Sequence, residues 1–248
     1  MKKGHLRALK AAVFLLCLLP LLKLLLEAYG IWGNLGANPV EEITHRTGLT
    51  ALTFLAITLG VTPLRQLLRF SALVHVRRMF GLYAFFYACL HFTVYWLDRA
   101  VFSGEGLSMD IVLEDIAKRP FITVGFTAFL LLTSLAVTST NGWVKRLGGK
   151  RWQRLHQLVY VAAVLGVLHF LWLVKADIRQ PAIYGLVLVG LLGWRVVWAR
   201  LEGRKRTSIG APTGLPTGSP ARANRGLAAA GDVPSSPGPR VTDLRVNG

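Results

Sequence analysis

The sequence has little charge and almost no cysteine. Only 17% of its 248 residues are charged, whereas 53% are hydrophobic, a balance unlike that of an average soluble domain. Cys17 and Cys89 both lie in apolar runs, and two isolated cysteines exclude a disulfide framework and a CxxC metal or redox site. We expect both to be small apolar packing residues.

The short motifs of several enzyme classes are also missing. The sequence contains no HExxH, no GxSxG, no GxxxxGK[ST] and no GxGxxG, so it offers no zinc-protease, hydrolase, P-loop or dinucleotide-binding signature. A chain without a nucleotide-binding domain cannot take hydride from a nicotinamide cofactor by itself. We therefore assign no catalytic residues, and electrons for any redox function must come from a separate reductase or from membrane quinol.

The formal net charge of +17 is typical of nucleic-acid-binding proteins as well as of some membrane proteins. Here the basic residues lie between apolar segments and in the C-terminal tail, which is how bacterial membrane proteins distribute charge over their cytoplasmic loops. We therefore expect contact with membrane lipid and no nucleic-acid partner.

Six apolar segments approach the ~20 helical residues that span a ~30 Å hydrocarbon core. They predict an all-α, polytopic fold, a bundle of about six transmembrane helices, because the bilayer offers no water to satisfy an open backbone. The predicted spans are Leu9–Ala28, Thr47–Leu64, Met79–Leu97, Phe121–Thr138, Leu155–Val174 and Ala182–Trp198.

Charge in the connections predicts the orientation. The N-terminus, the second and fourth connections and the C-terminal side are basic, whereas the first and third connections are more acidic. Basic loops of bacterial membrane proteins stay in the cytoplasm, so we expect both termini there and a multi-pass protein of the bacterial inner (cytoplasmic) membrane.

The two ends of the chain need separate interpretations. The first apolar segment follows basic residues, as a signal peptide does, but it is longer than an h-region of roughly 7–15 residues and no clear cleavage site follows, so we expect a retained helix. From Glu202 onward the chain is rich in Pro, Gly, Ser and Ala. We therefore predict a transmembrane domain over residues 1–201 and a disordered basic cytoplasmic tail over residues 202–248.

Three histidines, His91, His156 and His169, lie in these apolar segments. Ionisable residues at membrane depth are functional candidates, with an interhelical hydrogen bond as the alternative for each. His91 lies ~18 Å along the third segment and His169 ~21 Å along the fifth at the helical rise. Both segments run outward, so the depths nearly match. Imidazole is a strong ligand for haem iron, and we predict a haem between them with one imidazole from each.

His156 lies ~20 Å below His169 at the same rise and cannot serve the same iron. It could ligate a second haem or touch another cofactor. Arg77 and Arg78 occupy the corresponding depth on the third segment, where arginine suits haem propionates or a flavin phosphate. Because 13 residues do not return to one helix face, two sites would need different azimuths or a bent helix.

Several longer stretches occur in a fixed order over roughly residues 30–195. They are NLGANPVEEITHRTGLTAL, VTPLRQLL, VRRMFGLYAFFYACLHFTVYW, KRPFITVG, LAVTSTNGWVKRLGGKRWQRLHQLVYVAAVLGVLHFLWLVK and QPAIYG. In this combination the sequence resembles the MsrQ (YedZ) family, the haem-binding membrane subunits of the bacterial periplasmic protein-methionine-sulfoxide reductase system, within the wider ferric-reductase-like transmembrane group. The tail beyond Glu202 lies outside the resemblance.

The resemblance implies a b-type haem, one or two in number, and a bound FMN. It implies electrons from the quinone pool, or from a cytosolic flavin reductase, passing to a periplasmic molybdopterin-containing catalytic subunit that reduces methionine sulfoxide in oxidised proteins. The family's haem-associated histidines fall on His91, His156 and His169. The resemblance does not locate FMN. Arg77, Arg78, Arg151 and Trp152 are candidates for its phosphate or ring, or for a haem propionate. As ordinary positive-inside anchors they need no cofactor, and on the sequence alone we favour that explanation.

Two rival functions remain open on the sequence. A ferric-chelate reductase or other metalloreductase would use the same helical core with a different terminal acceptor. A non-redox transporter or scaffold would use the histidines for packing or proton relay.

Overall fold

The computed structural model describes residues 3–69, 72–103, 110–174 and 177–209. All regular secondary structure in these ranges is α-helical. The helices are α1 Lys3–Ala28, α2 Pro39–Leu68, α3 Leu73–Ser103, α4 Asp110–Lys118, α5 Pro120–Val137, α6 Asn141–Leu147, α7 Gly149–His156, α8 Leu158–Leu173 and α9 Arg179–Ile209.

Six spans in the described residues are long and apolar enough to cross a membrane, which confirms the predicted all-α polytopic class. They are Gly4–Ala28, Pro39–Leu68, Leu73–Val101, Pro120–Val137, Gly149–Leu173 and Arg179–Glu202. Most are longer than their apolar cores predict. In α2 a capping residue sets the first end, because the Asn38 side chain accepts a hydrogen bond from the Glu41 backbone N–H and Pro39 opens the helix. This cap starts the helix before its apolar stretch begins.

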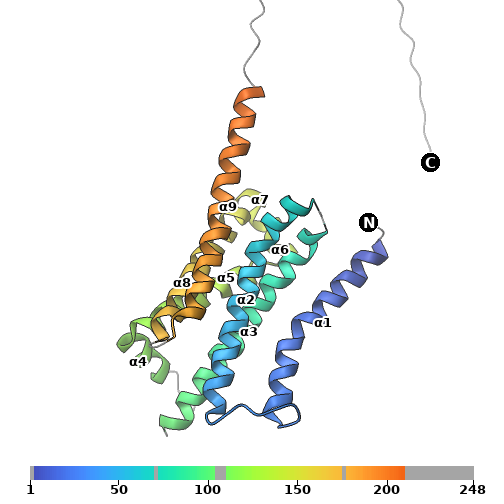
Figure 1. The fold of residues 1–248 in the computed structure, drawn as a ribbon. Helices are drawn as coiled ribbons and strands as arrows, with labels where there is room; N and C mark the ends of the chain where they lie inside the picture. The colour runs from blue at the N-terminus through green and yellow to red at the C-terminus, as the bar shows by residue number, and fades with distance from the viewer. Residues whose placement is uncertain (1–2, 70–71, 104–109, 175–176, 210–248) are drawn as a thin grey trace, which may run out of the picture. The chain divides into compact units, whose positions relative to one another are not determined.

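Two helix pairs make the most extensive contacts, α2 with α3 and α5 with α8. Figure 1 shows α1 outside the α2–α3 pair, while α5 and α8 lie on the other side of it. The connection from α1 to α2, helix α4 and the first turn of α9 share one end of the bundle, which we call the α4 end. The C-terminal end of α2, the N-terminal end of α3 and helices α6 and α7 share the other, the α7 end.

The fifth span consists of two helices. Helix α7 ends at His156 and α8 begins at Leu158, with a turn at Gln157 between them. Gly148, at φ 73°, precedes α7 and joins it to α6. This positive φ suits glycine, which has no Cβ to clash. The break after His156 separates the segment that carries this histidine from the segment that carries His169.

Helix α1 packs against α3 through two tyrosine hydroxyl groups. The Tyr83 hydroxyl donates to the Phe14 carbonyl at 3.0 Å, and the Tyr87 hydroxyl donates to the Cys17 carbonyl at 2.8 Å. The Leu21 backbone N–H donates to the Tyr87 hydroxyl at 3.1 Å. Helix α1 contains Pro20 and bends part-way along its length (Figure 1), as prolines within helices cause. Tyr87 therefore serves two backbone groups beside this bend.

The chain divides into two compact units, Met1–Arg206 and Thr207–Gly248. Helix α9 continues to Ile209. The predicted disordered tail, residues 202–248, lies outside the described residues from position 210 onward, and its disorder stays a prediction.

Candidate haem-binding site

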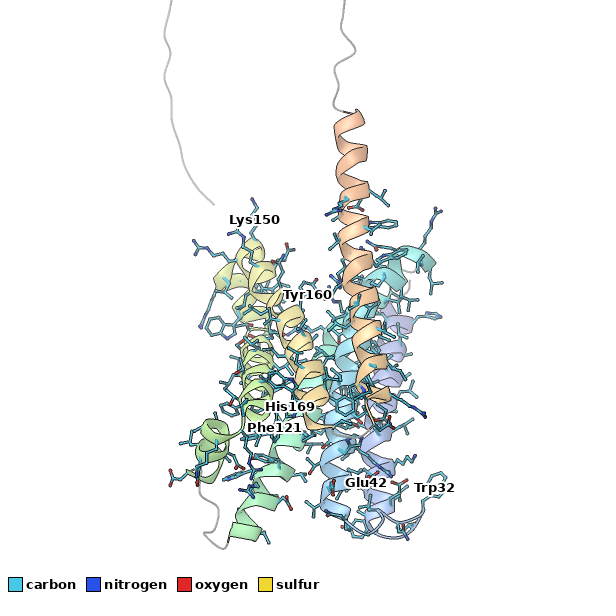
Figure 2. The ribbon with its side chains drawn as sticks, turned by 60° about the vertical axis from the view of Figure 1, so that its left-hand side comes forward. Trp32, Glu42, Phe121, Lys150, Tyr160 and His169 are labelled. Carbon is cyan, nitrogen blue, oxygen red and sulfur yellow. The ribbon has the colours of Figure 1, made fainter. Side chains whose placement is uncertain are left out.

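His91 of α3 and His169 of α8 come together in the half of the bundle near the α4 end. Their ring centres are 6.2 Å apart, and the ring planes are inclined at 78°. Both side chains are half-buried. Figure 2 shows His169 beside Phe121 of the neighbouring helix α5. Two residues that are 78 positions apart in the sequence thus face each other within the membrane-spanning part of the chain.

The same kind of hydrogen bond orients each imidazole. Nδ1 of His91 donates to the Thr44 carbonyl of α2 at 2.8 Å, and Nδ1 of His169 donates to the Phe121 carbonyl of α5 at 2.7 Å. A carbonyl oxygen only accepts, so Nδ1 carries the proton and Nε2 of each neutral ring keeps a free lone pair. Nε2 of these two rings has no hydrogen bond to any residue that the structure describes.

A glycine lies against each ring. A Cβ built on Gly48 would stand 2.9 Å from Nδ1 of His91, and a Cβ built on Gly125 would stand 2.6 Å from Nδ1 of His169. Real Cβ atoms do not approach other heavy atoms this closely, so alanine at either position would displace the ring. Each imidazole therefore occupies a notch in the neighbouring helix that only glycine leaves open.

The two notches have the same sequence spacing. Thr44 precedes Gly48 by four residues, and Phe121 precedes Gly125 by four. In an α-helix the carbonyl of residue i accepts the N–H of residue i+4. The carbonyl that accepts from each histidine is therefore the helical partner of the glycine that makes room for it. We call each carbonyl–glycine pair an imidazole notch.

The two free Nε2 atoms match the needs of a metal with two axial imidazoles. A metal about 2 Å from the nitrogen of each of two opposed imidazoles separates the ring centres by about 6 Å, close to the 6.2 Å here. The described residues contain no group of three or more His, Cys, Asp or Glu side chains that could hold a metal. A metal at this site would need its equatorial ligands from a porphyrin, so the residues present fit haem.

Aromatic side chains lie near the histidine pair. The ring of Phe121 lies 6.4 Å from that of His169, and the ring of Phe170 lies 5.7 Å from that of His45. On α3, Phe92 follows His91 directly and stacks on Phe129 of α5 at 5.1 Å. Apolar walls with a few directed polar groups are typical of cofactor sites.

His156 has different surroundings at the end of α7. Its ring stacks on Trp152 with the centres 3.8 Å apart. Nδ1 lies 3.2 Å from the Trp152 carbonyl, and Nε2 lies 3.3 Å from Oγ of Ser139. The Trp152 carbonyl only accepts, so Nδ1 of the neutral ring donates to it and Nε2 accepts from the Ser139 hydroxyl, which can also rotate to donate to the Leu135 carbonyl at 2.8 Å. Both ring nitrogens of His156 are engaged, whereas His91 and His169 each keep one free.

The predicted phosphate or propionate ligands divide into two groups. Arg77 and Arg78 lie within electrostatic range of His156, and Trp152 stacks on it. Nη1 of Arg78 donates to Oδ1 of Asn141 at 3.1 Å. Arg151 is exposed on α7, and no hydrogen bond or salt bridge connects it to this group within the described residues. The structure thus brings three of the four predicted residues to His156 and leaves the fourth apart.

Arg195 of α9 adds a cation that sequence reasoning missed. Its Nη1 donates to the Tyr160 hydroxyl, and its Nη2 donates to Oγ1 of Thr62 at 3.1 Å. Its Nε is buried without a hydrogen-bond partner among the described residues. Arg77 lies within electrostatic range of Arg195 and Arg65, and within the described ranges no salt bridge to a carboxylate neutralises any of the three.

Comparison with known proteins matches residues 44–167 to the family described as "Ferric reductase like transmembrane component". A protein-methionine-sulfoxide reductase heme-binding subunit MsrQ of Herminiimonas arsenicoxydans is 49% identical over 217 residues, 86% of this chain and 96% of its own length. The MsrQ of Xanthomonas campestris pv. campestris (strain 8004) is 57% identical over 175 residues, 70% of this chain and 77% of its own. The chain belongs to the MsrQ family. A third member, from Azospira oryzae, is 53% identical over 196 residues, 78% of this chain and 80% of its own.

Sequence reasoning missed the notch residues of this MsrQ family member. Thr44 and Gly48 lie in the stretch THRTG, and Phe121 and Gly125 lie in FITVG. A signal for them was present, since each glycine lies inside a predicted span or at its edge, where glycine has no turn to form. The sequence could not show which imidazole each glycine faces.

Proposed function

We propose that the chain is the membrane electron-transfer subunit of a protein-methionine-sulfoxide reductase system, with one b-type haem held by His91 and His169. The observation that carries this proposal is the pair of imidazole notches, which leave two Nε2 atoms free across a 6.2 Å separation of ring centres. The names of the MsrQ relatives support it, because those proteins are heme-binding subunits. When bound, haem supplies one-electron chemistry between ferric and ferrous iron.

The chain's own contribution is ligation and orientation. The Thr44 and Phe121 carbonyls fix the tautomer of each imidazole and make Nε2 a better donor, as hydrogen-bonded carbonyls do for metal-bound histidines. Gly48 and Gly125 let the rings lie close enough to the helices to form those bonds. Phenylalanines around the pair keep the site apolar, which together with the ligands sets the reduction potential.

We assign one haem rather than two. For His156 to ligate iron, Nε2 would have to give up Ser139, and its ring would have to leave the stack on Trp152. A second ligand opposite it would also be needed, but Arg77 and Arg78 are the nearby groups on α3. His156 is therefore better suited to contact a second cofactor than to bind iron.

That second cofactor is FMN at the α7 end. Arg77 and Arg78 would hold the phosphate, which accepts charge-assisted hydrogen bonds from guanidinium groups, and Trp152 offers an aromatic face to the flavin ring. No carboxylate among the described residues pairs with Arg77 or Arg195, which supports an anionic ligand here, because buried cations are normally paired. Arg151 is the weakest member of this set, since it is exposed on α7.

The proposed route crosses the bacterial inner membrane with both chain termini in the cytoplasm. Electrons arrive from quinol or from a cytosolic flavin reductase and leave at the α4 end, which is periplasmic in this orientation. The acceptor is a periplasmic molybdopterin-containing catalytic subunit. Basic residues at the α7 end support the orientation, because positive loops stay in the cytoplasm. Lys150 at that end and Glu42 at the α4 end are labelled in Figure 2.

The absorption spectrum of the purified protein tests the proposal. Oxidised and dithionite-reduced spectra should show a low-spin b-type haem, and a pyridine haemochrome count should give one haem per chain. Extraction and flavin chromatography should give one FMN. A folded, colourless preparation from haem-replete cells would contradict the electron-transfer function and favour a transporter or scaffold. Haem without transfer to a copurified molybdopterin protein, but with direct reduction of iron chelates, would favour a metalloreductase.

A further inference from the structure

A cavity of about 210 Å³ lies between α1, α2 and α3. Pro20, Lys23 and Leu24 of α1 form one wall, Tyr87 of α3 forms another, and the remaining residues come from α2, namely Arg46, Thr47, Leu49 and Thr50. All of them belong to the candidate membrane-spanning segments. The volume is below the ~300–1,000 Å³ of sites for drug-sized ligands and suits a single ring whose tail stays in lipid.

The cavity lies where α1 bends. Pro20 lies in its wall, and the Tyr87 hydroxyl, bonded to the Cys17 carbonyl and to the Leu21 N–H, holds α1 to α3 there. Helix α1 makes few contacts with α2. The bend of α1 therefore forms part of the cavity wall, and the hydrogen bonds of Tyr87 hold that part of α1 in position.

The cavity has a polar rim on one side and apolar walls on the other. Arg46 lines it and pairs with Glu27 of α1, whose side chain is only 11% exposed, and with Glu42. Nζ of Lys23 lies 3.9 Å from the Glu27 carboxylate. Leu24 and Leu49 supply apolar surface. The rim thus offers cationic donors and a shielded carboxylate that can accept a proton.

Only one helix separates the cavity from the His91 notch. Thr47 lines the cavity, and the next residue, Gly48, touches the ring of His91. The Thr47 hydroxyl donates to the Thr44 carbonyl at 2.9 Å, the same oxygen that accepts from Nδ1 of His91. Tyr87 lies one helical turn from His91. A ligand in the cavity would therefore lie at the depth of the proposed haem.

We propose that this cavity binds the ring of a membrane quinol and is the site where the quinol is oxidised. The proposal rests on the proposed function, which supplies the haem as electron acceptor, and it adds a location for the donor. A quinol matches the cavity in three respects: it dissolves in the bilayer, it has one polar ring with an apolar tail, and its oxidation needs a proton acceptor near an electron acceptor.

The reaction balances with groups already named. Both O–H bonds of the quinol break, giving the quinone, two electrons and two protons. A haem held by His91 and His169 would supply a one-electron acceptor, so two one-electron transfers would match one quinol. The protons leave in turn through the Glu27 carboxylate to water at the α4 end. Arg46 donates hydrogen bonds to the ring oxygen and holds Glu27 in position.

A matched pair of tryptophan variants tests the site. Leu24 lines the cavity and is 8% exposed, whereas its neighbour Leu25 is 46% exposed. In full-length protein in nanodiscs, Leu24→Trp should slow haem reduction by decylubiquinol at least about tenfold by filling the cavity. Leu25→Trp should reduce at the wild-type rate. Haem content, midpoint potential and dithionite reduction should be unchanged in both. Equal quinol-driven rates in the two variants would overturn the proposal.

Photolabelling with an azido-ubiquinone gives a readout that needs no haem. The label should appear on peptides containing Leu24 or Thr47, be displaced by decylubiquinone, and persist in His91→Ala. Label elsewhere, or displacement by phosphatidylglycerol but not by decylubiquinone, would make the cavity a lipid site and overturn the proposal. Failure of the proposed function would look different, because the wild-type protein would then lack a haem spectrum altogether.

Discussion

The histidines towards the two ends of the bundle differ in the hydrogen-bond partners of their ring nitrogens. Towards the α4 end, His91 and His169 each bond one ring nitrogen to a helix carbonyl and keep the other nitrogen free. Towards the α7 end, His156 has both nitrogens engaged and its face stacked on Trp152. The residue type is the same at both ends, so it does not separate a proposed iron ligand from a polar contact residue. The hydrogen-bond partners of the ring nitrogens do.

The difference originates in the neighbouring helices rather than in the histidines. At each notch a glycine lies four residues after the carbonyl, so the imidazole approaches a helix backbone closely. His156 bonds within its own helix and to a serine hydroxyl instead. A hydroxyl can rotate and both donate and accept, whereas a helix carbonyl is fixed and only accepts. Fixed acceptors produce one defined tautomer with one exposed lone pair.

Removing a notch histidine should have the largest effect. His169→Ala or His91→Ala removes one of the two proposed iron ligands, so we expect loss of nearly all haem and of electron transfer to the partner. Haem content relative to protein, from the haemochrome count, is the measurement. His75→Ala is the control, because this exposed histidine lies on the same helix as His91. A full haem complement in either ligand variant would show that the pairing is wrong.

Filling the His169 notch should have the next largest effect. In Gly125→Ala the new Cβ would stand 2.6, 2.8 and 2.9 Å from three ring atoms of His169, so the ring must move off the Phe121 carbonyl. We expect haem affinity to fall about 10–100-fold, as when an orienting partner of a metal-bound histidine is lost. Gly166→Ala, whose Cβ would meet only a leucine methyl at 3.5 Å, should retain wild-type affinity. Equal haem affinity in the two variants would show that the notch does not control haem binding.

Filling the His91 notch should have a smaller effect of the same kind. A Cβ on Gly48 would contact His91 at 2.9, 3.0 and 3.5 Å, so a smaller ring displacement relieves the overlap. We expect Gly48→Ala to retain haem with an affinity loss near tenfold, the low end of the range, and a raised midpoint potential because the Nδ1–H bond to Thr44 weakens. Redox titration and electron paramagnetic resonance report these changes. An unchanged potential would show that this bond does not tune the site.

Changing the other end should leave haem in place. In His156→Ala we expect wild-type haem content and potential, because Nε2 of His156 is already bonded to Ser139. We expect lower FMN content, since the Trp152 stack and the adjoining arginines would lose a partner. Loss of half the haem would instead indicate a second iron site and erase the contrast between the two ends.

Hydropathy and helical rise predicted a large part of this molecule. The apolar runs predicted all six membrane spans, because in the bilayer the backbone has few ways other than a helix to satisfy its hydrogen bonds. Depth alone paired His91 with His169, since both helices run in one direction at a fixed rise per residue. The ends of the helices were less accurate. Caps such as Asn38 act through local hydrogen bonds, which extend a helix beyond the apolar core that hydropathy detects.

The rest depended on which helix faces touch. Sequence could not reveal that Gly125 faces His169, because the two residues come from helices whose rotation about their axes follows from packing. The sequence also did not locate the break at Gln157, because it lies inside one apolar run. The spacing of 13 residues did indicate that His156 and His169 need either a bent helix or different helix faces. The pairing of Arg195 with Tyr160 likewise joins two helices that no local pattern relates.

The single oxygen of Tyr87 has a consequence for biogenesis. Helix α1 leaves the ribosome first, and at that stage the backbone beside its proline has no third helix to bond with. A polar backbone group left open in lipid costs several kcal/mol, so α1 gains a strong reason to hold one position only when α3 arrives with its tyrosine hydroxyl. Docking of the first helix is thereby timed by synthesis of the third, which also carries the first of the two proposed iron ligands.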